Sequence, residues 1–572
     1  MLQSYWSTRA AVVVAALLVT ACNDSTAPIS AARPIAGATG GVIRVASTGL
    51  ATAAGTARDP MTVEQAVAVA PAGAVIELAA GTYNTGNLVI SRPITLRAAD
   101  GASVTLRGST PIPSGQWQAM GNTWRTPWSN TGLPTAPTAS GREKASAVTL
   151  AAPRTTAAVA EEVNNEHELL VNATGGAQEY AVHQHMAFVD NRALQRVGSL
   201  GAVTAGSFFV DTAAKWLYIG QSPGGHEVAL SAQTVGLLLY AGNTRVTGLT
   251  LENFSQIGLR IQGANTQVDH NTIEYNGLDG LAINAANNAL VESNTVKWNG
   301  QAGIVANAAT GVIVESNNIS NNNTGNYDVS QYAAGIKVTQ MTNFIFRGNW
   351  VADNASNAVW IDVSSTNSTV TNNQVLRSLC YGIYIELGNG IIIAGNVVHD
   401  NTDGIGVHFT ENASIYNNTV TNNGLDLDVS AWDSQPAHDI TNAKIVNNLI
   451  WNAKSKLMVS LFRADGCDST AYSEVDYNGY YRPAGSPATD IVNWCNALYT
   501  TVGAFQSKAG YEVHGIEVDG GSDPFFVSIW TENFHLKAGS KAINAGQPLP
   551  ANIAAALGWR AGVPVSMGAL QN

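Results

Sequence analysis

Short runs of alternating apolar and polar residues, separated by glycine and asparagine, recur along the chain from about residue 246 to 452. Alternation over a few residues indicates β-strands, and the Gly and Asn between the runs indicate tight turns. The runs return with a regular period. Its plainest marker is a column of asparagines spaced mostly 22 to 24 residues apart: Asn271, Asn294, Asn317, Asn349, Asn373, Asn396, Asn418 and Asn448.

A second polar column follows the first by five residues and has the same period. Its members are Asn276, Asn299, Asn322, Asn354, Ser378, Asn401 and Asn423. The two long intervals, of 32 and 30 residues, contain insertions near 322–333 and 430–440. Three short strands in each period of about 23 residues predict a solenoid of stacked coils, with asparagine side chains bonded from coil to coil. A leucine-rich repeat would need a Leu-x-x-Leu-x-Leu frame, which the sequence lacks.

This pattern resembles that of the right-handed parallel β-helix superfamily, and the resemblance covers most of the mature chain. The segment MTVEQAVAVAPAGAVIELAAGTYN fits as well, because Thr62 and Gln65 form a capping box ahead of a short amphipathic helix. Such a helix covers the open first coil of secreted β-helix enzymes. The repeat period is absent between 111 and 232, where the sequence has the patterns of antiparallel strands and turns. The resemblance implies an all-β fold: a right-handed parallel β-helix with an N-terminal capping helix and an inserted antiparallel β-domain.

Composition divides the chain into six segments. An apolar run ending in Val-Thr-Ala-Cys predicts a lipoprotein-type signal peptide over 1–22 with Cys22 lipidated; an ordinary secretory signal is the alternative. Residues 23–57, rich in Ala, Thr, Ser, Gly and Pro, predict a flexible tether. The predicted segments after it are the cap helix and first coils (58–110), the inserted β-domain (111–232), the core coils (233–460), and the final coils with a C-terminal cap (461–572).

The net charge and the cysteine content limit the binding partners and the cellular location that we expect. A net charge of -12 disfavours nucleic acid, and we expect membrane contact only through the lipid anchor. The protein is expected to be exported, either as a bacterial cell-envelope lipoprotein facing the periplasm or the cell surface, or secreted. Export permits a disulfide between Cys467 and Cys495, which the sequence leaves open, while Cys380 is expected as a small core residue. No cysteine cluster or His-x-x-x-His spacing occurs, so no metal site is expected.

The coils align on a repeated Gly-Ile-x-Ile-x phrase whose second and fourth positions are apolar. Because side chains alternate across a strand, the third and fifth positions should face outward. The third positions are Arg260, Ala282, Val305, Lys337, Trp360, Tyr384, Gly406 and Asp428. The fifth positions are Gln262, Asn284, Asn307, Thr339, Asp362, Glu386, His408 and Ser430.

The chemically distinctive residues gather in four successive coils between the two insertions. Asp362 and Glu386 should lie about 5 Å apart on neighbouring strands, so that one carboxyl has a raised pKa and the pair supplies an acid and a base. An outer β face also carries polar residues for structural reasons alone, but two stacked carboxylates are costly and favour a site. The other catalytic candidates are Lys337 and His408; the substrate-binding candidates are Trp360 and Tyr384, as stacking surfaces, with Arg260 and Asp428.

Three functions fit this face. The first is a glycoside hydrolase acting on a polysaccharide or oligosaccharide through the paired carboxylates, with no cofactor. The second is a polysaccharide lyase, in which the carboxylates neutralise a uronate directly or through Ca²⁺ and Lys337 or His408 removes a proton. The third is a surface carbohydrate-binding or adhesive protein without catalysis. The motif sets of polygalacturonases and mannuronan epimerases are absent, so no family's catalytic residues are carried over.

Overall fold

The computed structural model describes residues 41–127, 129, 185–432 and 439–571. These residues all belong to one compact unit, which spans 38–572. The expected signal peptide, Cys22 and most of the expected tether lie outside the described residues. Among the helices that are described, none is long and apolar enough to cross a membrane.

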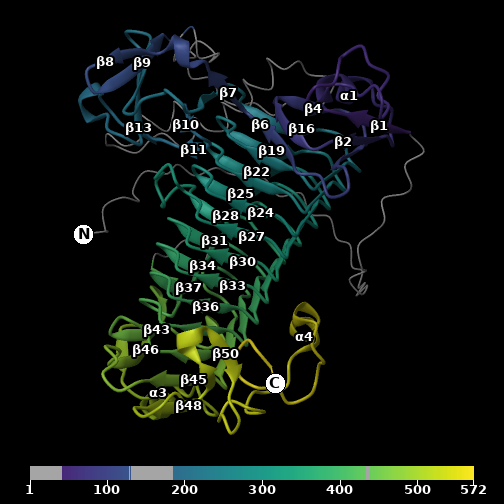
Figure 1. Ribbon diagram of the computed structural model, residues 1–572. Coiled ribbons are helices and arrows are strands. Elements are labelled where there is room, and N and C mark those ends of the chain that lie inside the picture. Colours follow the sequence, from purple (N-terminus) through teal and green to yellow (C-terminus); the bar gives the residue numbers. More distant parts are fainter. Residues whose placement is uncertain (1–40, 128, 130–184, 433–438, 572) are drawn as a thin grey trace. The chain divides into compact units, whose positions relative to one another are not determined.

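Each coil places one short strand in each of three 13-stranded sheets, and the coils succeed one another from β6 to β43 in Figure 1. Sheet I contains β1 (Val42–Val45), β2 (Val75–Leu78), β5 (Thr95–Ala98), β17 (Arg245–Thr247), β20 (Gln267–Asp269), β23 (Leu290–Glu292), β26 (Ile313–Glu315), β29 (Ile345–Arg347), β32 (Thr369–Thr371), β35 (Ile392–Ala394), β38 (Ser414–Tyr416), β41 (Ala443–Val446) and β44 (Tyr472–Asp476). Sheet II contains β3 (Gly81–Asn84), β6 (Val104–Arg107), β18 (Thr250–Glu252), β21 (Thr272–Glu274), β24 (Thr295–Lys297), β27 (Asn318–Ser320), β30 (Trp350–Ala352), β33 (Gln374–Leu376), β36 (Val397–His399), β39 (Thr419–Thr421), β42 (Leu449–Trp451), β45 (Gly479–Arg482) and β48 (Ile516–Asp519).

Sheet III carries the Gly-Ile-x-Ile-x phrases. It contains β4 (Leu88–Ile90), β16 (Val235–Leu239), β19 (Ile257–Ile261), β22 (Asp279–Asn284), β25 (Ala302–Asn307), β28 (Ala334–Thr339), β31 (Asn357–Asp362), β34 (Tyr381–Glu386), β37 (Asp403–His408), β40 (Leu427–Ala431), β43 (Leu457–Arg463), β46 (Asp490–Trp494) and β47 (Ala497–Tyr499). Neighbouring strands are parallel in all three sheets except for the antiparallel pair β46–β47. One apolar core runs inside the coils, formed by the inward side chains of all three sheets.

The first asparagine column forms a continuous hydrogen-bonded ladder between sheets I and II. In each step the amide Nδ2 donates to the Oδ1 of the next asparagine at 2.9–3.0 Å, from Asn271 through Asn448 to Asn478. Asn478 then donates to Glu512 Oε1 at 2.7 Å. The ladder thus ends on a carboxyl oxygen, which accepts the last amide hydrogen in place of another asparagine.

The second column forms a similar ladder that also ends on a buried acid. Asn276 donates to Asn299, Asn299 to Asn322 and Asn322 to Asn354, at 2.9–3.0 Å. The ladder resumes when Asn401 donates to Asn423, which donates to Asp426 Oδ1 at 3.0 Å. Burial raises the pKa of Asp426 well above its usual value.

The glycine of the repeated phrase is required by this second ladder. A Cβ on Gly280 would lie 2.7 Å from Asn299 Nδ2 and 2.6 Å from Val296 Cγ1, closer than real Cβ contacts allow. A Cβ on the glycine at 258, 303, 335, 382 or 404 would likewise lie too close to a ladder asparagine Nδ2 and to a core valine or isoleucine. Ala358 takes the glycine's place in the one coil whose ladder residue is Ser378, where the sequence lacks the longer asparagine.

The N-terminal end differs from expectation at one boundary. Helix α1 (Val63–Val69) begins at the predicted cap, with Thr62 Oγ1 accepting from Gln65 N at 3.3 Å. The predicted tether over 23–57 is wrong for its last part, because Val42–Val45 forms strand β1 and pairs with β2. Arg44 also forms an ion pair with the buried Glu77. The Val-Ile-Arg-Val alternation was obscured by the surrounding small residues.

The chain leaves the coils after β6 and returns at β16. Between them, a four-stranded antiparallel sheet consists of β11 (Arg192–Ala193), β10 (Ala187–Val189), β15 (Val228–Ser231) and β7 (Ser109–Ile112). A five-stranded sheet consists of β12 (Gln195–Arg196), β13 (Ser207–Asp211), β14 (Trp216–Ile219), β9 (Thr123–Pro127) and β8 (Gln118–Met120), antiparallel except for β12–β13. Short 3₁₀ turns lie at η1 (Ser114–Gln116) and η4 (Leu200–Ala202). The predicted fold class, a parallel β-helix with a capping helix and an antiparallel insertion, is therefore confirmed.

The C-terminal segment does more than close the last coil. Helix α3 (Val502–Ala509) packs Val502 and Phe505 into the end of the core. After β48 the chain turns back, and η5 (Ile529–Thr531) with the hairpin of β49 (Phe526–Ser528) and β50 (Asn533–Leu536) packs on the outer side of sheet II. Helix α4 (Ala551–Leu557) packs on sheet I near β35. The predicted cap over 461–572 is therefore wrong for its last part, which lies along earlier coils instead.

Replacing Gly280 with Ala should lower the thermal unfolding midpoint, because the added methyl group overlaps the ladder amide and a core valine. Overpacking of this kind costs about 1–3 kcal/mol. Gly503→Ala in helix α3 is the matched control, since nothing lies within 4 Å of its Cβ and Ala is the better helix former. Calorimetry should show a lower midpoint for the first variant and an equal or higher one for the second. A midpoint for Gly280→Ala at or above wild type would contradict the proposed fit.

Stability should fall as the pH rises from about 4.5 to 7, because burial raises the pKa of Glu512 to about 7. The folded state binds the proton more tightly than the unfolded state, so this contribution is complete below the unfolded pKa and is lost through the folded one. The shift corresponds to about 3 kcal/mol. Glu512→Gln should flatten the pH dependence of the unfolding midpoint, while the control Asp100→Asn, at an exposed turn, should leave it unchanged. An equally steep dependence in Glu512→Gln would refute the assignment.

Candidate functional site on sheet III

The strand register brings the predicted columns together in the expected order. Lys337 pairs with Trp360, Trp360 with Tyr384, and Glu386 with His408 across neighbouring strands. Asp428 follows two strands after Tyr384, opposite Gly406. Asp362 ends β31 and Glu386 ends the adjacent β34 in the same column. The four coils from β28 to β37, together with β40, thus present one continuous polar and aromatic cluster.

Lys337 lies beneath this cluster. Its ammonium contacts Asp362 Oδ2 at 2.6 Å and lies 2.8 Å from the ring centroid of Trp360. The Lys337 side chain is only 3% exposed, and this burial lowers its pKa to about 8 although Asp362 and Glu386 act in the opposite direction. The other carboxylate oxygen of Asp362 accepts from the backbone N–H of Val363 at 2.6 Å. Two donors therefore fix the orientation of the Asp362 carboxylate.

Glu386 begins a chain of polar contacts that crosses three strands. The Tyr384 hydroxyl hydrogen-bonds the Glu386 carboxyl and lies 3.2 Å from His408 Nδ1. His408 Nε2 lies 3.0 Å from Asp428 Oδ2. The result is a carboxyl–phenol–imidazole–carboxylate series, in which a proton on Nε2 would be directed to Asp428.

The environments of the acidic groups differ. Burial first, and the negative charge of Asp362 second, raise the pKa of Glu386, which the positive groups offset only in part. Burial also acts to raise the pKa of Asp428, but the hydrogen bond and the charge of His408 outweigh this effect, so the pKa is lowered. Burial raises the pKa of Tyr384, so the phenol stays protonated. Neighbouring carboxyls with unlike environments are the usual basis for dividing acid and base roles.

Exposure differs among the residues of the cluster. Asp362 and Asp428 have side chains 18% and 16% exposed, and Tyr384 and Glu386 are half-buried. By contrast, Lys337, Trp360 and His408 are buried. Trp360 is therefore not the stacking surface that its outward position predicts: Lys337 covers its ring and Tyr384 packs against it at 5.5 Å.

Two aromatic residues at the site were missed by the column analysis. Tyr381 precedes the phrase glycine and stacks on Tyr384 with ring centroids 4.8 Å apart. Trp432, in the second insertion, is 48% exposed and meets His408 edge-on at 4.7 Å. The column just before the phrase glycine, where Tyr381 pairs with Asp403, was the signal that could have identified Tyr381. For Trp432 there was no periodic signal, because it lies past the end of its strand.

Arg260 does not join this cluster. It is 2% exposed in β19, three coils before Lys337, which corresponds to about 14 Å along the sheet. Tyr327 of the first insertion is half-buried, and the charges of Asp279 in β22 and Arg196 in β12 act on its hydroxyl. The structure therefore places Arg260 in a buried position away from the paired carboxyls.

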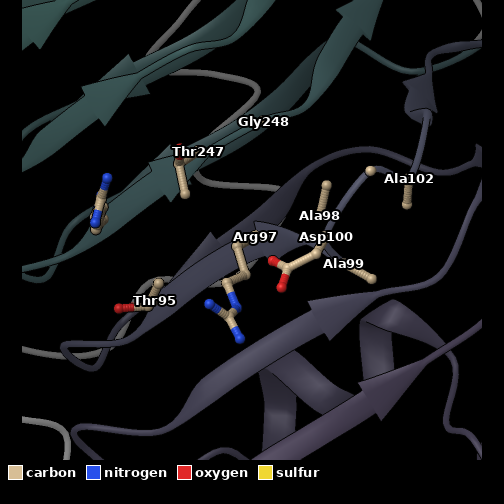
Figure 2. Close-up of a pocket in the computed structure, with 10 residues that line it drawn as sticks. Thr95, Arg97, Ala98, Ala99, Asp100, Ala102, Thr247 and Gly248 are labelled. Atoms are coloured by element: carbon tan, nitrogen blue, oxygen red, sulfur yellow. The ribbon is translucent and has the colours of Figure 1, made fainter.

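The residues that the structure describes hold no group of three or more His, Cys, Asp or Glu arranged for a metal ion. A separate cavity of about 340 Å³ lies at the end of β5 and includes one carboxylate, Asp100 (Figure 2). Its two arginines, Arg97 and Arg245, are already bonded to Glu77 and Asp269. This cavity therefore lacks the paired carboxyls that distinguish sheet III.

Comparison with known proteins supports the fold. A family model described as "Right handed beta helix region" matches residues 229–375, and "Periplasmic copper-binding protein (NosD)" matches 324–460. No curated protein sequence matches the chain. A solved structure titled "The complex structure of XylC with xylose" aligns with a TM-score of 0.53 and 13% identity, over 85% of this chain and 87% of that one. At this identity the likeness shows the right-handed parallel β-helix fold alone.

Two further solved structures align over most of their length with lower scores. A pectate lyase, Pel9A, has a TM-score of 0.38 and 14% identity, covering 94% of this chain and 98% of its own. A structure titled "Glycoside hydrolase" has a TM-score of 0.41 and 12% identity, covering 88% and 100%.

Lys337→Met should destabilise the protein by about 2 kcal/mol, because Asp362 loses its ammonium partner in a largely buried position. Adding Asp362→Asn to Lys337→Met should recover at least half of the loss, since no uncompensated charge remains. The matched control is Lys297→Met: Lys297 also contacts a carboxylate, Glu274, and an indole, Trp298, but is 27% exposed. Denaturant unfolding should show less than about 1 kcal/mol there. Equal losses at the two lysines would contradict the buried pair.

Proposed function

We propose that this right-handed parallel β-helix protein is an exported glycoside hydrolase that cleaves a polysaccharide or oligosaccharide on the outer face of sheet III. The observation that carries the proposal is the pair Asp362 and Glu386, at the ends of adjacent strands and in unlike environments. Neighbouring strands are about 4.8 Å apart, which is compatible with the carboxyl separation of about 5 Å in retaining glycosidases.

We assign different roles to the two carboxyls on the basis of their surroundings. Asp362 is held by an ammonium and a backbone N–H, which suits a fixed carboxylate nucleophile. Glu386, with its raised pKa, suits the general acid. In the first step Asp362 bonds to the anomeric carbon, the glycosidic C–O bond breaks, and the Glu386 proton passes to the leaving oxygen. In the second step a water gives its proton to Glu386, attacks the anomeric carbon and releases Asp362.

The other residues support this reaction. Tyr384 and His408 link Glu386 to Asp428 and fix the acid in position. Trp432, rather than the buried Trp360, offers an exposed ring beside the site on which a sugar can stack. A lyase would need a free base, and the amine with the lowered pKa, Lys337, is instead enclosed by Asp362 and Trp360. A lyase using Ca²⁺ and a non-catalytic binding protein remain the outcomes that the assays below separate.

Two features of the protein agree with export, the N-terminal segment and a disulfide. The leader-like segment with Cys22 predicts a lipid-anchored envelope protein. Cys467 and Cys495, left open by the sequence, form a disulfide in the structure. Structural disulfides persist in oxidising compartments such as the periplasm. Cys380 is unpaired and, contrary to expectation, only partly buried.

Incubation of the protein with a panel of neutral and uronate polysaccharides, with and without Ca²⁺, tests the proposal. We expect new reducing ends and no ultraviolet-absorbing unsaturated ends. Asp362→Asn should reduce kcat at least about 10³-fold on every substrate, whereas Glu386→Gln should spare aryl glycosides with acidic leaving groups, which need no proton. Gln262→Ala, at the same column position four coils before Asp362, is the control and should retain activity. Unsaturated ends would indicate a lyase, and unchanged activity in both carboxyl variants would place the site elsewhere.

The product should keep the anomeric configuration of the substrate, since two inversions follow from the short carboxyl separation. Proton NMR of the first-formed hemiacetal, recorded before mutarotation, would measure this. Inversion would mean that a water fits between the carboxyls and that Asp362 is a base rather than a nucleophile.

A further inference from the structure

A groove of about 940 Å³ lies on the outer side of sheet II, away from the carboxyl pair. Its floor is one column of side chains in register: His399, Thr421, Trp451 and Tyr481, from β36, β39, β42 and β45. Its walls are the loop 483–487 and the returning C-terminal segment 521–537. Ligand pockets are typically about 300–1,000 Å³. The groove is therefore large enough for a ligand of several rings.

The lining of this groove contains polar atoms whose hydrogen-bonding capacity is unused. Within the described part of the chain, Thr421 Oγ1, Trp451 Nε1 and Asp523 Oδ2 have no hydrogen-bond partner. Thr421 and Trp451 are 1% and 4% exposed, so water does not compensate them freely. A buried polar group left without a partner is costly. Thr421 Oγ1 can donate and accept a hydrogen bond, Trp451 Nε1 can only donate one, and Asp523 Oδ2 can only accept one. Ligand hydroxyl groups can pair with all three kinds of atom.

The charges around the groove disfavour an anionic ligand. Burial acts to raise the pKa of Asp400, but hydrogen bonds from His399 and Lys454 outweigh it and lower the pKa to about 2. The other carboxylates of the lining are Asp523 and Glu532, which is exposed and ion-paired with Arg377. Lys537, the lysine of the lining, is bonded to the backbone carbonyl of Asp523. The lining itself holds three carboxylates and one lysine, so it favours sugar hydroxyls, which donate to carboxylates, over uronate or phosphate groups.

The floor is also linear. Four strands at about 4.8 Å spacing give a length of about 14 Å, crossed at right angles to the strands. The indole of Trp451 and the phenol of Tyr481 pack against each other with ring centroids 5.6 Å apart at the β45 end of this floor, and both are buried. A straight groove with hydrogen-bonding groups along it fits a linear chain of sugar rings better than a compact metabolite.

We propose that this groove is a second saccharide-binding site, which takes an uncharged oligosaccharide segment of a polymer. Binding there does not depend on catalysis. Its purpose rests on the proposed function: holding one part of a polymer on sheet II would raise the effective concentration of another part at sheet III. Short soluble substrates, which cannot engage both sites, would gain nothing from it.

The test uses the full chain with Glu386→Gln, so that saccharides are not cleaved. Isothermal titration with xylo-, cello- and manno-hexaose measures binding, with oligogalacturonate and oligolysine as charged controls. The comparison protein carries Thr421→Val and Asp523→Asn in addition. These substitutions remove the unused oxygens, while the amide oxygen introduced by Asp523→Asn can keep the bonds that Asp523 Oδ1 accepts from Phe525 and Phe526. The variant should therefore fold as stably as its parent.

We expect two classes of site for one of the neutral hexaoses in the parent, and loss of at least about fivefold in affinity for one class in the variant. With Glu386 intact, Thr421→Val/Asp523→Asn should cleave short substrates normally and long or insoluble polymers more slowly. Unchanged binding in the variant would overturn the proposal. So would binding of no neutral saccharide, or of oligolysine alone, which would indicate a peptide groove. Groove binding without any cleavage would leave this inference standing and refute the hydrolase instead.

Discussion

The constraint on which this structure depends is the hydrogen bond between equivalent asparagines of successive coils. Each asparagine side chain accepts a hydrogen bond from the coil before and donates one to the coil after. Equivalent residues of successive coils must therefore lie in register. A one-residue slip would break the ladder and would also turn core side chains outward. Residues in one column of sheet III are therefore held about one strand spacing apart over the whole solenoid. The pairing of Asp362 with Glu386 follows from this register, because nothing in their own strands brings them together.

The same register explains which features were predictable from the sequence. The period, the apolar positions and the columns of Lys337, Glu386 and His408 follow from local patterns that repeat, and the structure reproduces their order. The burial of Trp360 and Arg260 does not follow, because it depends on side-chain contacts that the alternation within a strand does not specify. The return of the C-terminal segment along sheets I and II was missed for the same reason: its contacts join residues more than 100 positions apart, as between Asn417 and Ser566.

Burial gives the site its chemical asymmetry. A lysine and an indole beneath the carboxyls exclude water from one side, so charges interact more strongly there than on an open β face. The ammonium is placed against one carboxyl, while the other has a phenol and an imidazole as neighbours. Two carboxyl groups on adjacent strands thereby acquire different surroundings, and the pKa of Glu386 is raised. A regular solenoid alone would have given them nearly equal surroundings.

The repeat departs from its own rules in the coil that carries the site. Ser378 replaces the ladder asparagine there, and Ala358 replaces the glycine that an asparagine would require. Asn357 supplies a substitute bond, since its Oδ1 accepts from Tyr381 N at 3.1 Å while its Nδ2 reaches Val329 O in the first insertion at 3.4 Å. The departure thus fixes Tyr381 at the start of the strand that bears Glu386 and ties an insertion to it. Departures from a local pattern that are compensated elsewhere are expected at functional positions. In this solenoid the asparagine ladder is interrupted beside the paired carboxyls, and Asn357 compensates for it.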